Sequence, residues 1–594
     1  MSAPSRLQGL ILPDPDLMAE TAPYLRLTGG ARPESGALHL PAGARAGTDT
    51  WFNLFNLGKW RRHCGLSSLA LVLRGAGRVE VTLRLARPDG EETLLRREVW
   101  LGAAPLRLDL PGLAEIHGKA LIWHEMRALE PARLEAADWV SDDAPRRLPR
   151  LVLSITTFRR EAAVRRTVAR FEAFMARTPL ADRLHLVVVD NGRSAGLAPS
   201  AHVTPIPNEN LGGSGGFARG LLEARARGAS YCLFMDDDAA IHMDSLERTW
   251  AFLAHAEHPA TAVAGAISSA ADKAEIWENG AIFASRCWPR FNATDLRDRA
   301  EAFEMEFETT APPPPQHYGG WWFFAFPVDV ARHMPFPFFV RGDDISFGLA
   351  NLFEVVTLPG VLSFQDADFA EKESAMTLYL DLRSHLAHHL ALPRLEIGRA
   401  RTARIPAWFF GRSMLPCHYE TLAALNLALE DVLRGPDFFA RNADMAQRRA
   451  DIAALRRDEV WRPVEGPLPP DRVLLDPQRA WVRWLMKLTL NGHLLPFFGL
   501  WGNRVTLSVG ARGNFRRAWG AARITYLDAE GAQFYTVRHS KRRALVQGLR
   551  MCRNIARLAW RYPRLLAEWR QGYGALASEG FWRRRLGLPD GDAR

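Results

Sequence analysis

Short apolar runs recur through residues 37–140 and are separated by Gly, Pro and Asp. Runs such as 67–73, 78–84 and 106–110 have the length and spacing typical of an all-β domain. Acids, bases and nucleophiles do not cluster in this part of the sequence. We therefore predict an N-terminal β-sandwich domain over residues 1–145 that serves as a binding or spacer module.

The pattern changes after residue 145, where strand-like runs begin to alternate with helical periodicity. The strand-like runs are 150–156, 185–190, 202–206 and 231–235, and the helical segments are 161–175 and 215–227. This alternation predicts an open, mostly parallel α/β sheet. Ligands of such sheets bind beyond the carboxyl ends of the strands, so the polar residues found there are the informative ones.

From about residue 400 the sequence is mostly helical in its periodicity and rich in Arg, Leu and Trp. We therefore expect a multidomain α/β protein with domains at 1–145, 146–400 and 401–594. The third domain is expected to be mainly α-helical and to end in a basic tail.

The tail carries nearly all of the net charge of +10. Residues 541–594 contain 13 Lys and Arg against 4 Asp and Glu, whereas residues 1–540 are nearly neutral. Arginines at 550, 553, 557, 561 and 564 would share one helical face. Such a helix suits an anionic membrane surface, and a helix packed on the protein with a solvated Arg face fits equally well. Nucleic-acid binding is not expected, because the neutral remainder has no basic stripe.

The five cysteines are scattered without a CxxC pair, which fits a reducing compartment. The first residues have too short an apolar run for a signal peptide. The best uncharged stretches, 309–328 and 488–503, contain prolines and do not predict a spanning helix. We expect a cytoplasmic protein, with peripheral binding to the cytoplasmic face of the plasma membrane as an option.

Three aspartates, Asp236, Asp237 and Asp238, end one of the strand-like runs. Alternate residues of an extended segment share a face, so Asp236 and Asp238 can point to one site. A hard divalent cation such as Mn²⁺ or Mg²⁺ relieves their repulsion and usually also binds substrate phosphates. The alternative is a helix N-cap run, although caps favour a single Asp. We predict a metal or nucleotide site.

The glycine-rich segment 208–216 opens a predicted helix. It suits close approach of the backbone to a nucleotide or diphosphate, and a plain tight turn would look the same. Asp343 and Asp344 lie between two apolar runs. A carboxylate near the metal could act as general base toward a hydroxyl, or the pair could simply cap a helix.

A dense aromatic block occupies residues 318–324. Aromatic faces bind the apolar faces of sugars and bases. The flanking glycines favour Trp321 and Trp322 as surface residues, whereas a core strand is at least as good an interpretation for Phe323 and Phe324.

Taken together and in order, these blocks resemble the family 2 glycosyltransferases of the GT-A (Rossmann-like) fold. Among them, the resemblance is to the galactan-polymerising galactofuranosyltransferases of mycobacterial cell walls. It covers roughly 150–390, and residues 49–56 also resemble the segment that leads into that family's β-sandwich. The matching segments are TFRR at 157–160, DNG at 190–192, NLGGSGGF at 210–217, FMDDD at 234–238, GWW at 320–322, FFVRGDDISFG at 338–348 and LPGV at 358–361.

The resemblance implies an inverting, metal-dependent transfer of galactofuranose from a UDP-sugar to a hydroxyl of a cell-surface or lipid-linked glycan. It also implies a role for each matching residue. Arg160, Asn191 and Asn210 would contact UDP, Asp237 would lie close to it, Asp236 and Asp238 would bind the metal–diphosphate, Asp344 would be the catalytic base, Trp321 and Trp322 would line the sugar site, and Glu278 would match an acidic sugar-binding residue.

The sequence departs from the family at two places. Phe364-Gln365 replaces a Trp-His pair whose His is a metal ligand, although Asp366 and Asp368 lie close by. Gly342 replaces the usual Trp before the Asp pair. The histidines further along the chain, at 385, 388 and 389, are expected to be structural. These changes leave open another donor, such as dTDP-rhamnose or UDP-glucose, or a catalytically weak glycan-binding scaffold.

Overall fold

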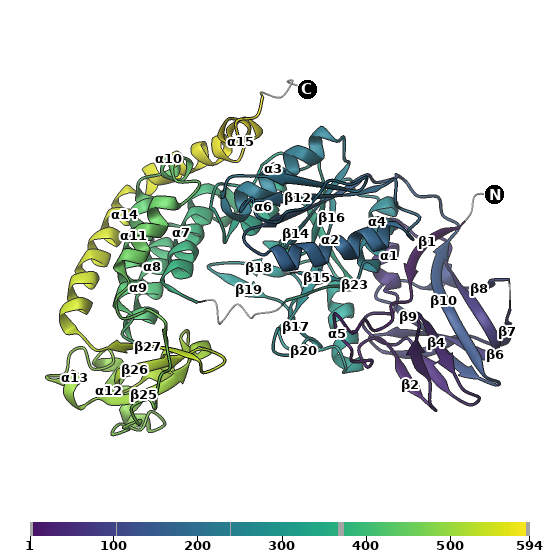
Figure 1. Ribbon diagram of the computed structural model, residues 1–594, viewed down its shortest axis with the longest axis horizontal. Helices are drawn as coiled ribbons and strands as arrows, with labels where there is room; N and C mark the ends of the chain where they lie inside the picture. The colour runs from purple at the N-terminus through teal and green to yellow at the C-terminus, as the bar shows by residue number, and fades with distance from the viewer. Residues whose placement is uncertain (1–3, 103, 238, 366–372, 590–594) are drawn as a thin grey trace. The chain divides into compact units, whose positions relative to one another are not determined.

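The computed structural model describes residues 4–102, 104–237, 239–365 and 373–589 (Figure 1). The chain divides into two compact units. The first comprises residues 1–210, 216–332 and 347–366, and the second comprises 211–215, 333–346 and 367–594. Because this division cuts through the region 146–400, the three domain boundaries expected from the sequence stay a prediction. No helix in the described part of the chain combines the length and apolar character that crossing a membrane requires.

The N-terminal part of the first unit is a sheet in which every recorded strand pair is antiparallel. Its centre is the long strand β6 (Ala70–Arg87), along which Val79, Val81, Leu83 and Leu85 are buried. A strand-rich N-terminal region agrees with the sequence pattern, and its description as a sandwich stays a prediction. Within the described residues, the path runs β2 (Arg26–Thr28), β5 (Arg45–Gly47), β9 (Leu121–Ala128), β6, β10 (Ala132–Ser141), β4 (Ala37–Leu40) and β3 (Arg32–Glu34), with β1 (Ser5–Gly9), β7 (Gly90–Leu101) and β8 (Leu106–Asp109) on its sides.

The second sheet of the first unit begins as the sequence predicts. Strands β11 (Leu151–Thr157), β12 (Leu184–Asp190), β13 (Val203–Pro207) and β14 (Tyr231–Asp236) pair in parallel. The helix α2 (Glu161–Met175) follows β11, and α3 (Gly212–Ala226) follows β13. Each of these elements lies within three residues of its predicted bounds.

Beyond β14 the expectation of a mostly parallel sheet is wrong. Strand β22 (Phe324–Pro327) is antiparallel to β14, and β16 (Thr261–Ser268) is antiparallel to β22 and to β17 (Glu275–Glu278). Among the described strands of this sheet beyond β14, β23 (Glu354–Phe364) alone pairs in parallel, with β16. The sheet is therefore mixed. Parallel neighbours need a crossover connection, and most strands of the second half are not joined to their neighbours in that way.

A buried ion pair joins the two sheets of the first unit. Lys59 lies in α1 (Leu57–Cys64) and Glu306 in α5 (Arg299–Thr310), with 2.7 Å between Nζ and Oε2, and neither side chain is exposed. Asn56 and Trp51 donate to the same carboxylate at 2.8 and 3.0 Å. Burial lowers the pKa of Lys59, and the charge of Glu306 opposes that change. The segment 49–56 therefore contributes to the junction between the sheets.

In the second unit, four long helices pack together: α7 (Ala375–Ala391), α8 (Arg399–Met414), α9 (Tyr419–Leu433) and α14 (Lys541–Leu576). Helix α14 buries Met551, Leu558 and Trp569. Arg550 binds both oxygens of Glu430 on α9 at 2.8 and 2.7 Å. The basic tail helix thus packs against the protein and leaves only part of its Arg face to solvent.

The second unit also contains a small sheet that the helical periodicity did not predict. In the part of the chain that the structure describes, it has four strands in the order β24 (Arg462–Pro463), β27 (Gln533–Arg538), β26 (Ala521–Leu527) and β25 (Asn503–Ser508). β24 has only two residues, and Arg504 and Arg523 interrupt the apolar alternation of β25 and β26, so the sequence signal of the sheet is weak.

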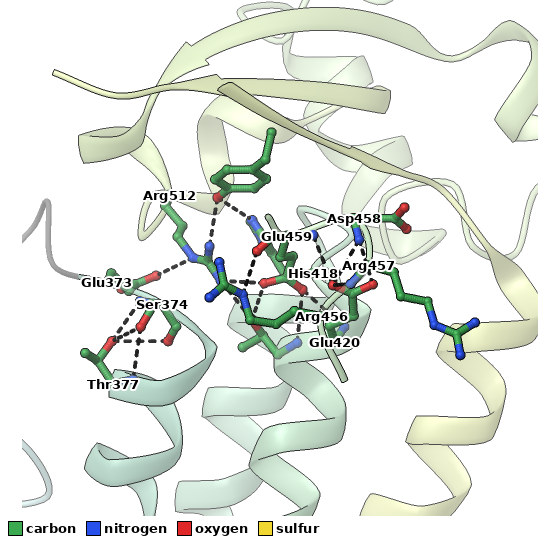
Figure 2. Close-up of polar contacts among 12 residues, drawn as sticks. Glu373, Ser374, Thr377, His418, Glu420, Arg456, Arg457, Asp458, Glu459 and Arg512 are labelled. Carbon is green, nitrogen blue, oxygen red and sulfur yellow. Dashed lines mark hydrogen bonds and ion pairs between the residues drawn. The ribbon is translucent and has the colours of Figure 1, made fainter. Parts of the chain in front are cut away.

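A polar network links this sheet to the helices (Figure 2). The Glu459 carboxylate accepts from the backbone N–H groups of Glu420 and Thr421 at the start of α9, at 3.1 and 3.0 Å. Glu420 in return accepts from the backbone N–H of Glu459 at 3.0 Å. Arg512, which is buried, donates to Glu459 at 2.7 Å and to the Tyr535 hydroxyl of β27 at 2.8 Å. A negative charge at a helix N-terminus is stabilising, and Arg512 neutralises it.

The junction of the first unit can be tested by changing one member of its ion pair. Lys59→Met leaves the Glu306 carboxylate buried without its cation, so we expect a loss of about 3–5 kcal/mol in the free energy of unfolding. Denaturant titration measures it. Adding Glu306→Gln should restore much of the loss, because no charge then stays buried.

The control for this experiment is the exposed pair Arg32–Glu34, with 3.1 Å between its charged atoms. Glu34→Gln should change stability by no more than about 1 kcal/mol. An equally small effect of Lys59→Met would contradict the importance of the buried pair.

Candidate active site

The loops that follow β11 and β12 bring predicted donor residues to one edge of the sheet. Asn191 follows β12, where its backbone N–H donates to the Thr157 carbonyl at 2.9 Å. Its side-chain oxygen accepts from Asn208 at 2.9 Å. Asp190 accepts from the backbone N–H groups of Gly192 and Ala195 at 2.9 and 2.7 Å, and so shapes the loop. Asn191 is therefore held in place by backbone contacts at the end of two neighbouring strands.

The aspartate run lies at the end of β14, on the same edge. The Arg160 guanidinium, at the start of α2, lies 3.8 Å from the Asp237 carboxylate. Two residues that the resemblance assigns to the donor site therefore lie side by side. Asp236 is partly exposed, whereas Asp238 falls outside the described residues.

The alternative interpretation of the aspartate run as a helix cap does not hold. The next helix, α4 (Asp244–His255), begins well after the run, has Met243 at its N-cap and is preceded by β15 (Ala240–Ile241). Among the described residues, which omit Asp238, no group of three His, Cys, Asp or Glu side chains is close enough to hold a metal ion.

The side-chain amide of Gln365, at the position of the family's metal-binding His, is buried and oriented. Its nitrogen donates to the Ser268 carbonyl at 3.0 Å, which commits the NH₂ end of the amide and leaves the carbonyl oxygen as the end that can act as a ligand. Asp366 and Asp368 fall outside the described residues. Glu278 ends β17 opposite Ile267 and is also buried.

The glycines of α3 have a packing role that their sequence does not reveal. A Cβ on Gly216 would lie 2.1 Å from Cγ2 of Thr156, and one on Gly220 would lie 1.8 Å from Oγ of Ser154. Both contacts are with β11, so these glycines let the helix approach the strand that leads into the donor loops. Close helix–strand packing therefore accounts for Gly216, at the end of the glycine-rich segment.

The expectation that Trp321 and Trp322 are surface residues is wrong, since their exposed fractions are 4% and 8%. Trp321 packs edge-on against Phe217 and Phe234, with ring centroids 4.9 Å apart in each case. The Trp322 indole donates to the Gly265 carbonyl at 2.9 Å. The flanking glycines allow tight packing of these rings and do not expose them. A role of either ring in lining the sugar site stays a prediction.

Asp343 and Asp344 open α6 (Asp343–Asn351), and their first turn belongs to the second unit. Asp343 is buried and accepts from the Ser214 hydroxyl at 3.0 Å. Asp344 is half-buried, and its carboxylate accepts from the backbone N–H of Ile345 at 2.8 Å. Burial and the neighbouring charge of Asp344 raise the pKa of Asp343, and burial raises the pKa of Asp344. Of the two, Asp344 is the more accessible carboxylate.

The residue before the pair explains one departure from the family. Gly342 has φ +91°, and a Cβ there would lie 2.6 Å from Cβ of Ser384 and 2.8 Å from Cε1 of His388, both on α7. Only glycine fits this conformation and space without strain. His388 donates from Nε2 to the Gly342 carbonyl at 2.8 Å and stacks on Phe338. As expected, this histidine has a structural contact.

The chain matches two family models. One, described as glycosyl transferase family 2, covers residues 153–310, and the other, galactofuranosyltransferase 2 N-terminal, covers residues 29–142. The first spans the strands and loops that carry Arg160, Asn191 and Asp236. The second spans most of the N-terminal sheet.

Two curated relatives align with most of the chain. The galactofuranosyltransferase GlfT2 of Mycolicibacterium smegmatis is 26% identical over 462 residues, which are 71% of this chain and 69% of that protein. The GlfT2 of Mycobacterium tuberculosis is 25% identical over 485 residues, 74% and 73% of the two chains.

Among solved structures, the mannosyltransferase PcManGT from Pyrobaculum calidifontis, in complex with GDP-Man and Mn²⁺, aligns with 53% of this chain and 83% of its own. Its TM-score is 0.29 at 17% identity, a likeness too low to carry a conclusion. Residues 153–310, which match the first family model, include the loops described above. The chain is a glycosyltransferase that resembles family 2 and, within it, the mycobacterial galactofuranosyltransferases.

Proposed function

We propose that the protein transfers galactofuranose from UDP-galactofuranose, with inversion, to a hydroxyl of a cell-surface or lipid-linked glycan. The alignment with two galactofuranosyltransferases over at least two thirds of both chains carries this proposal. The polar residues at the ends of β11, β12 and β14 support it, because they offer amide, guanidinium and carboxylate groups at one edge of the sheet.

The donor is proposed to bind at this edge. Arg160, Asn191 and Asn210 would contact the UDP group, with Asp237 close by. The Arg160 guanidinium and the Asp237 carboxylate lie 3.8 Å apart, which supports a common role of the two residues at the donor.

Mn²⁺ or Mg²⁺ fits the oxygen ligands of this region, which are carboxylates and the oriented Gln365 amide. Asp236, Asp238 and Gln365 would hold the ion, with Asp366 or Asp368 as alternative third ligands. When bound, the ion would neutralise charge on the departing diphosphate. Glu278, Trp321 and Trp322 are proposed to shape the sugar site, the last two from buried positions.

Asp344 is proposed as the base that takes the proton from the acceptor hydroxyl. Its half-buried carboxylate has a raised pKa, which makes it a stronger proton acceptor than an exposed aspartate. Asp343, which is buried and accepts from Ser214, is better suited to hold the turn than to react.

Replacing the proposed base tests this assignment. Asp344→Asn should lower kcat by about 10²–10⁴-fold, because the amide cannot accept the proton, while UDP affinity stays unchanged. Steady-state transfer assays and UDP titration measure the two quantities. The exposed Asp109→Asn is the control and should behave as the parent protein. Normal turnover by Asp344→Asn would refute the role of this residue as base.

The pH dependence gives a second test. The base must be deprotonated, so kcat/KM should fall as pH falls through a pKa above the ordinary aspartate value of about 3.9. The positive charge of Arg341 lowers the pKa of Asp344. Arg341→Gln should therefore move the acid limb of the profile to higher pH, whereas the exposed Arg32→Gln should not. An acid limb that stays in place in Arg341→Gln would argue against Asp344 as the titrating group.

Thermal-shift measurements with nucleotide sugars, with and without Mn²⁺, separate the candidate donors. UDP-galactofuranose with Mn²⁺ should raise Tm most, because a ligand that binds the folded state stabilises it. A larger shift with dTDP-rhamnose or UDP-glucose would favour another donor. Glycan binding without any transfer would favour a binding scaffold.

An anionic membrane surface is a further proposed partner, through residues 541–594. Arg553 and Arg564 of α14 are 65% and 77% exposed at their side chains, although Arg553 lies 3.9 Å from Glu430 and Arg564 lies 2.7 Å from Glu568. These exposed arginines are the groups that could meet lipid phosphates.

A further inference from the structure

A hollow of about 550 Å³ lies on one face of the N-terminal sheet, outside the candidate active site. Every residue that lines it lies between Arg26 and Arg127. Five arginines, three carboxylates and three threonines contribute to the lining, and its described residues include no aromatic side chain. A sugar therefore cannot be held there by stacking on a ring, and recognition must come from charge and hydrogen bonds.

Strand β9 shows how this face of the sheet divides into a covered part and an open part. Trp123, Glu125 and Arg127 alternate along β9 and therefore share a face. Trp123 is buried against Phe303 of α5, with ring centroids 5.5 Å apart. Glu125 and Arg127, further along the strand, line the hollow. The hollow thus lies beside the part of the face that α5 covers.

Two arginines face each other directly on the floor of the hollow. Arg45 of β5 and Arg127 of β9 are partners in the antiparallel register. Both side chains are exposed, and neither guanidinium forms a hydrogen bond or ion pair with another of the described residues. Like charges directly opposite each other on a sheet are destabilising. A face that only had to meet solvent would be more stable with an acid at one of these two positions.

The carboxylates of the lining do not compensate this pair. Each of the three lies within ion-pair distance of another arginine of the hollow. Because five arginines line the hollow, the excess of two positive charges resides at Arg45 and Arg127. The three ion pairs are Arg96–Glu80 at 3.0 Å, Arg84–Glu125 at 2.9 Å and Arg26–Asp49 at 3.4 Å.

A glycine keeps space open beside the facing arginines. Gly47 of β5 lies between Arg26 of β2 and Glu125 of β9 in the register of the sheet. A Cβ on Gly47 would lie 2.8 Å from Oδ1 of Asp49, which also lines the hollow. A side chain at this position would therefore displace the Asp49 carboxylate and enter the hollow.

The groups of the lining match a sugar that bears negative charge. A guanidinium donates in a planar fork that fits the oxygens of a carboxylate or a phosphate. Thr28 lies opposite Arg45, and Thr82 lies opposite Glu125, so hydroxyl groups flank the arginines. Hydroxyls and carboxylates together offer the donors and acceptors that sugar hydroxyls require. A neutral glycan is a poorer occupant, because it leaves the facing charges uncompensated.

We propose that this hollow binds a saccharide residue that carries a carboxylate or a phosphate. Arg45 and Arg127 bind the anionic group, and the threonine hydroxyls and the paired carboxylates bind the sugar hydroxyls. The site goes beyond the transferase function proposed above. It shares no residue with the donor site, and it requires neither a metal ion nor the transfer reaction.

Calorimetric titration of the full chain with three soluble probes tests the proposal. Trigalacturonic acid carries carboxylates, galactose 6-phosphate carries a phosphate, and galactotriose carries neither. At least one acidic probe should bind at least about ten-fold more tightly than galactotriose, because hydrogen bonds between charged groups are the stronger ones. The acidic probe that binds more tightly identifies the anionic group that the site prefers.

The variant Arg45→Gln with Arg127→Gln removes the two charges that carry the proposal. Its affinity for the preferred acidic probe should fall at least about ten-fold. Its Tm without ligand should equal or exceed that of the parent protein, because the repulsion between the facing charges is gone. The Tm therefore separates the loss of a binding group from a loss of folding.

The matched control is Arg97→Gln with Arg133→Gln, which removes two exposed arginines of the same sheet that do not line the hollow. Arg97 follows Arg96 on β7, and successive residues of a strand point to opposite faces. This control should bind the probes as the parent protein does. Binding and stability are the only readouts, so a failure of the transferase proposal would not be mistaken for a failure of this one.

Three results would overturn the proposal. The first is equal affinity of the parent protein for galactotriose and both acidic probes, or no binding of any probe. The second is unchanged affinity in Arg45→Gln with Arg127→Gln. The third is a fall in the Tm of that variant, which would assign the facing arginines to the stability of the sheet.

Discussion

The first unit depends on a carboxylate that is buried completely and yet fully satisfied. Glu306 accepts from the lysine of α1 and from an indole and an amide of the segment that precedes this helix. Apolar packing of similar volume would often be as stable as a buried ion pair. The carboxylate adds geometric specificity, because each hydrogen-bond donor must lie at a defined distance and angle from it. These contacts tie α1 and the segment before it to α5.

Burial and hydrogen-bond partners also distinguish Asp344, the candidate base, from its neighbour Asp343. Asp343 is buried and accepts a hydrogen bond from the Ser214 hydroxyl, so its carboxylate is occupied by a contact within the protein. Asp344 accepts from the backbone N–H of Ile345 and is half-buried, so part of its carboxylate stays accessible. Two adjacent residues of one type thus differ in chemistry because their surroundings differ, and no property of the side chains themselves distinguishes them.

Local periodicity was enough to predict the first half of the second sheet of the first unit. β11, α2 and β14 have clear apolar patterns, and the polar residues at their ends belong to the predicted donor site. Periodicity failed where pairing is between distant segments, as for β16 and β22, since a buried strand has the same pattern in either direction. It also failed for Trp321 and Trp322, because glycines beside a ring can mean exposure or tight packing. The contact between Ser214 and Asp343 spans 129 residues and leaves no local signal.

The network around Arg512 has a consequence for how the second unit comes apart. Glu459 binds the start of α9, Arg512 binds Glu459, and the same guanidinium binds the hydroxyl of Tyr535 in the small sheet. Separation of the sheet from the helices would break the contact between Arg512 and Glu459, both of which are buried. Partial opening at this point is therefore costly, and we expect the helices and the small sheet to unfold together.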